Sequence, residues 1–230
     1  MARLPRFCPS GLPQHIIQRG INRNICFVDD QDFSAYAHWL YEYSVKFKVK
    51  IHAWVIMTNH VHILATPSAD DGISLMMQAL GRRYVQYFNA TYQRSGTLWE
   101  GRYKSSTVDT EKYVLICYRY IELNPVRAHM VNDPSDYKWS SYRYNALGIK
   151  SLICTPHEAY LSLGATADDR HKCYRELCSN HIDEKLLCDV RKALNKGHAL
   201  GSERFLDEIE TLYGRRFKPG KMGRPKSIRV

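Results

Sequence analysis

The hydrophobic pattern is clearest in the first third of the chain, where two strand-like runs are separated by only two polar residues. The runs occupy residues 50–57 and 60–66, and the Thr-Asn pair between them predicts a β-hairpin. In the second run, the two-residue period of a strand places His60, His62 and Leu64 on one face. This pattern predicts a sheet with two imidazole side chains on the same side.

Similar periodicities predict the other elements of the first 150 residues. Strands are expected at 14–19 and 97–108, and helices, from apolar residues at helical spacing, at 33–47, 73–94 and 110–124. Pro125 should end the last of these helices, because proline disfavours the α conformation in the residue before it. The order is β-α-β-β-α-β-α, which predicts a ferredoxin-like α+β fold: an antiparallel sheet with helices on one face.

The chain changes character after residue 150 and predicts a small all-α extension. The run TPHE at 155–158 predicts a capping box with Pro156 at the first helical position. Further helices are expected near 168–179, 183–195 and 202–213. The last stretch holds seven basic and no acidic residues, which predicts a flexible arm. We therefore divide the chain into a catalytic domain at 1–150, a helical DNA-binding extension at 151–214 and a basic tail at 215–230.

Charge and composition narrow the class of partner. The chain has 230 residues, 33 Lys and Arg against 23 Asp and Glu, and a formal net charge of +10, which favours a polyanion such as nucleic acid. Sixteen tyrosines supply aromatic rings suited to stacking on bases. No apolar run approaches the roughly 18 residues of a membrane span. Seven cysteines without a CxxC pair indicate reduced thiols, so we expect a cytoplasmic protein without a membrane partner.

Candidate chemistry comes from the histidine pair and from one tyrosine. His60 and His62 make half of a divalent-metal site, although an isolated pair is more often two ordinary, half-exposed histidines. Tyr120 and Asn124 are four residues apart in the predicted helix at 110–124 and so share a face. A tyrosine hydroxyl becomes an effective nucleophile when a metal polarises the phosphate that it attacks.

Several motifs then occur in one order. They are RGINR at 19–23, NHVH at 59–62, GRRYVQYFN at 81–89, LWEGRY at 98–103 and YRYIELNPVRA at 118–128. Together these motifs resemble the IS200-like single-tyrosine (Y1) transposases, and most closely the REP-associated tyrosine transposases found in bacteria. The resemblance covers residues 10–145.

The resemblance implies a fold, a reaction and a set of residues. It implies an HUH enzyme with a ferredoxin-like fold, in which Tyr120 is the nucleophile and His60, His62 and Asn124 hold Mg²⁺ or Mn²⁺. The implied reaction is cleavage and rejoining of single-stranded DNA beside a palindromic, REP-like hairpin through a 5′-phosphotyrosine. The implied protein acts in DNA transposition and recombination, as a monomer or a homodimer, in the bacterial cytoplasm near the nucleoid. The active site is formed within one chain or across two.

The remaining candidates concern DNA contact. The residues expected to bind DNA are Arg19, Asn22, Arg23, Arg82, Arg83, Arg102, Arg215, Arg216, Arg224 and Lys226. Tyr113 and Tyr118 are rival nucleophiles, but Tyr118 points about 160° away from Tyr120 on a helix. A zinc site among the Cys and His of 171–188 is disfavoured, because the spacing matches no common zinc module. The alternative functions are a non-catalytic DNA-binding regulator and an RNA-binding module; the latter lacks an RNP1-like run.

Overall fold

A computed structural model describes residues 8–110, 113–181, 183–214 and 216–217. Its centre is one four-stranded sheet in the order β2-β3-β1-β4, and every pair of neighbours is antiparallel. The strands are β1 (Gln14–Arg19), β2 (Val49–Ile56), β3 (His60–Pro67) and β4 (Lys104–Thr107). The prediction of an α+β, ferredoxin-like sheet is therefore confirmed, including the hairpin between β2 and β3.

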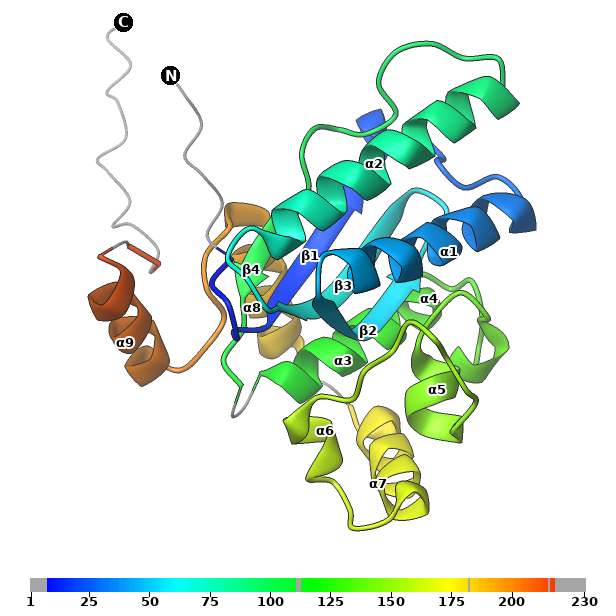
Figure 1. The fold of residues 1–230 in the computed structure, drawn as a ribbon. Helices are drawn as coiled ribbons and strands as arrows, with labels where there is room; N and C mark the ends of the chain where they lie inside the picture. The colour runs from blue at the N-terminus through cyan, green and yellow to red at the C-terminus, as the bar shows by residue number, and fades with distance from the viewer. Residues whose placement is uncertain (1–7, 111–112, 182, 215, 218–230) are drawn as a thin grey trace, which may run out of the picture.

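Helices α1 (Asp30–Lys46) and α2 (Gly72–Thr91) cover one face of this sheet (Figure 1). Asp29 and Asp32 form a reciprocal capping box at the start of α1, which satisfies backbone N–H groups that have no partner inside the helix. The core between helices and sheet is aromatic: Tyr36 of α1 and Tyr84 of α2 are both fully buried there.

The opposite face of the sheet is covered by α3 (Val114–Glu122), which Figure 1 shows on the far side of the sheet from α1 and α2. Val114, Cys117 and Ile121 of α3 pack in one cluster with Val55 and Leu64 of the sheet. The expectation of helices on one face thus holds for α1 and α2 but not for α3. Strands β2 and β3 bury apolar side chains on both faces, with Ile51 and Ile63 in one cluster and Val55 and Leu64 in the other, so both faces must be covered.

The helix break near Asn124 differs from the prediction that Pro125 ends a helix. Helix α3 already ends at Glu122, and a short helix α4 (Asn124–Arg127) follows with Pro125 in its first turn. Proline is tolerated in a first turn because the N–H that it lacks would have no helical partner there.

A buried carboxyl group ties α3 to the helices after residue 140. Glu122 accepts hydrogen bonds from Ser141 Oγ, from Asn145 Nδ2 at 2.6 Å and from Tyr174 Oη at 2.6 Å. Burial raises its pKa to about 7, against the opposing effect of these three donors. Asn145 lies on α5 (Tyr142–Leu147) and Tyr174 on α7 (Ala167–Ser179), so both helices are anchored to α3 through one side chain.

The capping box predicted for TPHE at 155–158 is wrong. Thr155 donates its N–H to the Ile51 carbonyl at 2.6 Å, and the N-cap of α6 (Glu158–Leu161) is His157. The backbone at Thr155 is thus held at the β2 edge of the sheet instead of starting a helix.

The described residues also include two short 3₁₀ segments, η1 (Ile21–Arg23) and η2 (Pro134–Asp136).

The C-terminal helices lie close to their predicted positions. They are α7, α8 (Glu184–Lys196) and α9 (Glu203–Tyr213). Helix α8 packs against β4 and β1, so the extension meets the edge of the central sheet. Phe217 is buried with Ala199 and Ile209, whereas residues 218–230 of the predicted basic tail lie outside the described residues. None of the helices among the described residues combines the length and the hydrophobicity that a membrane span requires.

Candidate active site

One pocket of about 250 Å³ brings together the four residues that the sequence singled out for chemistry. His60 and His62 come from β3, Tyr120 from α3 and Asn124 from the start of α4. The rest of the lining consists of Ile17, Arg19, Arg127, Ala128, Arg191, Leu194 and Asn195. Residues from the sheet, from the helix behind it and from the C-terminal extension therefore meet at one place.

Strand register explains why the two histidines share this pocket with β1. His60 lies opposite Arg19 and His62 opposite Ile17 in the antiparallel β1–β3 pair. Because side chains alternate along a strand, all four project from the face that α3 covers. His15 is two residues before Ile17 and so lies on the same face.

Each histidine of the pair has one ring nitrogen held by a neighbour. His60 Nδ1 lies 2.6 Å from Asn59 Oδ1, which can only accept, so His60 donates this hydrogen bond. His62 Nδ1 lies 2.9 Å from His15 Nε2. Both contacts leave Nε2 as the nitrogen available to a ligand, which is how metal-binding histidines are usually oriented.

Burial favours the neutral form of the three imidazole groups. Burial, reinforced by the charge of Arg19, lowers the pKa of His60 to about 4. Burial, with Arg127 nearby, lowers the pKa of His15 to about 3. Burial also holds the pKa of His62 well below its usual value, with further contributions from His60, His15 and the arginines. Neutral imidazole is the form that binds a metal, because its second nitrogen keeps a free lone pair.

The donor set fits a divalent cation only if an amide completes it. Among the described residues, no group of three or more His, Cys, Asp or Glu side chains could hold a metal ion, which includes the Cys and His of 171–188 that the structure describes. His60, His62 and Asn124 line one pocket, and residues of these types can offer two imidazole nitrogens and one amide oxygen to a cation. Imidazole and oxygen ligands together suit Mn²⁺ slightly better than Mg²⁺.

Tyr120 lies against this donor set. Its ring centroid is 5.6 Å from that of His62 and 5.5 Å from that of His15, both in edge-on geometry. The guanidinium carbon of Arg127 lies 4.6 Å from the centroid of the same ring. Only 7% of Tyr120 is exposed, so its ring is fixed by its neighbours while the residue still lines the pocket.

The rival tyrosines lie elsewhere. Tyr118 is fully buried, stacks on Tyr160 with ring centroids 6.0 Å apart, and accepts a hydrogen bond from the His157 N–H through its hydroxyl. Tyr113 is the N-cap residue of α3 and does not line the pocket. Tyr120 is thus the tyrosine of α3 that lies beside the histidine pair.

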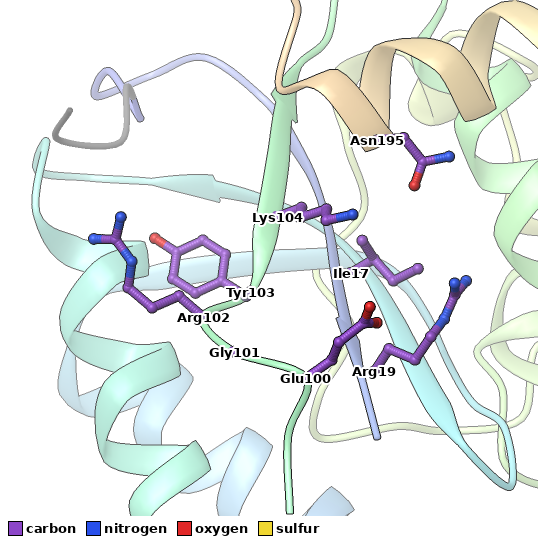
Figure 2. Close-up of a pocket in the computed structure, with 8 residues that line it drawn as sticks. All are labelled: Ile17, Arg19, Glu100, Gly101, Arg102, Tyr103, Lys104 and Asn195. Carbon is purple, nitrogen blue, oxygen red and sulfur yellow. The ribbon is translucent and has the colours of Figure 1, made fainter. Parts of the chain in front are cut away.

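A second pocket, of about 280 Å³, continues the first one along the β4 edge and shares Ile17, Arg19 and Asn195 with it. Figure 2 shows Lys104 and Arg19 on the side of Asn195, whereas the Arg102 side chain points the other way. Arg102 also lines a third groove, of about 990 Å³, together with Arg82 of α2. Neighbouring hollows share lining residues, and Arg19, Arg82 and Arg102, which the sequence proposes for DNA contact, line them.

The other predicted DNA contacts are dispersed. Asn22 and Arg23 lie in η1 with positive φ angles of 52° and 61°, and Asn59 Nδ2 donates to the Arg23 carbonyl at 3.0 Å. This bond links the RGINR loop to the residue that orients His60. Arg83 does not line these hollows, and its guanidinium carbon lies 5.2 Å from the centroid of the Trp39 ring.

Most of the C-terminal basic residues predicted to bind DNA lie outside the described residues. Arg216 is exposed, and Arg215, Arg224 and Lys226 lie outside the described residues.

Sequence reasoning missed four residues at or beside the pocket. They are His15, which holds His62, and the lining residues Arg127, Arg191 and Asn195. His15 had a signal, because it continues the two-residue period of Ile17 and Arg19 on a predicted strand. Arg127 had one too, since it lies in the NPVRA run. Arg191 and Asn195 carry no local signal.

Comparisons with known proteins concern the family and the fold. The family model described as "Transposase IS200 like" matches residues 9–124. The fold is similar to that in the "Structure of the REP associates tyrosine transposase bound to a REP hairpin", at 19% sequence identity and a TM-score of 0.52, over 68% of this chain and 93% of that one. A putative transposase from Deinococcus radiodurans R1 has 22% identity and a TM-score of 0.37, over 50% and 92% of the respective chains. No curated protein matches the chain.

Proposed function

The chain belongs to the IS200-like transposase family, and on this premise we propose that it is an HUH transposase of the REP-associated kind. In this proposal it cleaves and rejoins single-stranded DNA beside a palindromic, REP-like hairpin, in the bacterial cytoplasm near the nucleoid.

The observation that carries the proposal is the convergence of four side chains in one pocket. Tyr120 supplies a nucleophile, and His60, His62 and Asn124 supply donors for a divalent cation, all within one chain. An ordinary core would bury a tyrosine without placing it beside two histidines whose Nε2 atoms remain available. The convergence also supports an active site formed by a single chain, without residues from a second copy.

Strand cleavage in this site is a transesterification. The Tyr120 hydroxyl attacks the scissile phosphorus, so that an Oη–P bond forms and the P–O3′ bond breaks. The phenol proton leaves to solvent and the departing 3′ oxygen takes up a proton, which leaves a 5′-phosphotyrosine and a 3′-OH. Attack by a 3′-OH reverses the step, so joining needs no ATP. Mg²⁺ or Mn²⁺, held by His60, His62 and Asn124, would polarise the phosphate and stabilise the leaving oxygen.

Two features support a hairpin substrate. The solved relative with a similar fold is described as bound to a REP hairpin. In this chain the pocket itself is lined by Arg19, Arg127 and Arg191 and by no Asp or Glu, which provides charge for a phosphate backbone. The neighbouring grooves add Lys104, Arg102 and Arg82, beside the acidic Glu100, Asp70 and Asp71.

Trapping the covalent intermediate tests the proposal. Single-stranded hairpin DNA labelled at its 3′ end is incubated with the protein and Mn²⁺, because the label then stays on the strand bonded to tyrosine. Wild type should form an adduct that resists denaturation, Tyr120→Phe should form none while binding the DNA as tightly, and EDTA should prevent the reaction. Tyr118→Phe is the matched control and should keep the adduct. Tight hairpin binding without any adduct would instead identify a non-catalytic DNA-binding regulator.

A further inference from the structure

Resting on the cleavage reaction proposed above, we propose that Arg127 is a further catalytic residue: it binds the scissile phosphate and holds Tyr120 for attack on it.

The first observation is how Arg127 is attached to the nucleophile. Its guanidinium carbon lies 4.6 Å from the centroid of the Tyr120 ring, and its Nη2 donates a hydrogen bond to the Tyr120 carbonyl oxygen. The break at Leu123 makes this possible, because the new helix α4 carries Arg127 back over the last turn of α3. The guanidinium is therefore fixed relative to both the ring and the backbone of Tyr120.

The second observation is a donor without an acceptor. Arg127 Nη1 is buried and has no hydrogen-bond partner. Across the residues that the structure describes, no carboxylate lies within ion-pair distance of the guanidinium. A buried cation without an anion is costly unless something else supplies the anion. The side chain is thus oriented by Tyr120 and still has a donor to offer.

The third observation is the charge of the surroundings. Arg19, Arg127 and Arg191 all line the catalytic pocket, and its lining includes no Asp or Glu. A pocket with three guanidinium groups and no carboxylate is complementary to a phosphodiester, whose non-bridging oxygens carry the negative charge.

This arrangement has a chemical use in the cleavage step. As the Oη–P bond forms and the P–O3′ bond breaks, negative charge builds on the non-bridging oxygens of the phosphorus. A fixed guanidinium stabilises this charge more than it stabilises the ground state, because it needs no reorientation during the reaction. Arg127 would therefore act on the rate of the chemical step and only modestly on DNA affinity.

The test removes the charge from the phosphate as well as from the protein. The scissile position is first mapped with wild type, and a second substrate then carries a methylphosphonate there, in which a methyl group replaces one charged oxygen. Adduct formation is measured under single-turnover conditions. Arg127→Ala should slow it by about 10²- to 10³-fold on the phosphodiester. On the methylphosphonate, the difference between wild type and Arg127→Ala should shrink to about tenfold or less, because its ground state is uncharged and its transition state carries one negative charge fewer for Arg127 to stabilise.

Arg119→Ala is the matched control. Arg119 lies one residue before Tyr120, donates to a backbone carbonyl at Asn180 and also has a buried nitrogen, Nε, without a partner, yet it does not line the pocket. Its replacement should leave the rates on both substrates unchanged. An equal loss by Arg127→Ala on both substrates would show that Arg127 is only structural and would overturn the inference, as would a wild-type rate on the phosphodiester.

A binding measurement separates failure of this inference from failure of the proposed function. In a Tyr120→Phe background, Arg127→Ala should weaken binding of the phosphodiester strand by about threefold to tenfold and leave binding of the methylphosphonate strand nearly unchanged. If wild type forms no adduct while this difference appears, the cleavage reaction is wrong and the phosphate site stands. If adducts form but Arg127→Ala changes rate and affinity by the same factor on the phosphodiester and on the methylphosphonate, the inference is wrong. The cleavage reaction then stands.

Discussion

His62 Nδ1 lies 2.9 Å from His15 Nε2, and both residues are almost completely buried, at 2% and 1% exposure. The contact joins neighbouring strands and fixes the orientation of the His62 ring, so that His62 Nε2 remains for a ligand. His15 does not line the pocket itself, yet it determines how one side of the pocket is presented. It is a positioning residue for the proposed metal ligand.

Loss of this support should weaken metal binding. His15→Ala removes the group that holds His62, and loss of such a partner typically lowers metal affinity by about 10- to 100-fold. The affinity for Mn²⁺ is measured directly, from the electron paramagnetic resonance signal of the free ion, so that the result does not depend on DNA cleavage. His15→Gln keeps a polar group near His62 Nδ1 and should retain most of the affinity.

A second buried histidine provides the control for that experiment. His52 lies on β2 outside the pocket, and its ring nitrogens lie 2.8 Å from the Thr155 carbonyl and 2.8 Å from Thr66 Oγ1. His52→Ala should destabilise the fold and leave the Mn²⁺ affinity unchanged. An equal loss of affinity in His15→Ala and His52→Ala would contradict a specific role for His15.

His52 also predicts a dependence of stability on pH. Burial is the main cause that lowers its pKa to about 4, although the bond to Thr155 opposes the shift. The folded state therefore binds fewer protons than the unfolded state below pH 6.5, so stability present above pH 6.5 is lost as the pH falls toward 4. The contribution of this one group at pH 4.5 is roughly 2 kcal/mol.

Urea denaturation of wild type and His52→Asn at pH 7.5 and pH 4.5 measures this contribution. Asparagine keeps a donor for the Thr155 carbonyl but cannot gain a proton. The packing cost of the substitution is the same at both pH values. The decrease in unfolding free energy between pH 7.5 and pH 4.5 should be smaller in the variant by roughly 2 kcal/mol. The buried histidines of the pocket are common to both proteins, so their acid sensitivity cancels in the comparison. Identical acid loss in both proteins would show that His52 is not responsible.

Local patterns placed the candidate side chains on particular faces, whereas their proposed roles came from the resemblance to the Y1 transposases. The period of a strand placed His60 and His62 on one face, and helical spacing placed Tyr118 and Tyr120 on different faces; the structure shows both arrangements. These signals are local because each depends only on the geometry of one element. The proximity of Asn124 to Tyr120 was also expected, although the helix breaks between them.

Features that depend on tertiary packing could not be read in the same way. The sequence TPHE has the residues of a capping box, but pairing with Ile51 at the sheet edge holds Thr155 instead. The position of α3 on the opposite face follows from the need to bury β2 and β3 on both sides, which no single segment reveals. Arg191 and Asn195 reach the pocket only because α8 packs on β4 and β1.

Arg191 of α8 lines the pocket, so we expect the C-terminal extension to contribute to DNA binding there. Arg191→Ala should weaken binding of single-stranded DNA and reduce the slope of log K against log salt by about 0.7, the value for one phosphate contact on a single strand. Lys192→Ala is the matched control, because Lys192 is also exposed on α8 but does not line the pocket. Salt titrations of both variants should show the smaller slope for Arg191→Ala alone. Equal slopes in the two variants would contradict a specific contact from Arg191.

The basic end of the chain should add affinity and leave the chemistry intact. A cut after Phe217 keeps the ring that packs on Ala199 and Ile209 and removes five basic residues, Lys218, Lys221, Arg224, Lys226 and Arg229. If roughly half of them contact phosphates at once, the slope of log K against log salt should flatten by about 2. Cleavage at saturating DNA should survive, because every residue of the proposed active site lies before the cut. An unchanged slope would show that this segment does not contact DNA, whereas loss of cleavage at saturation would show that it helps to form the active site.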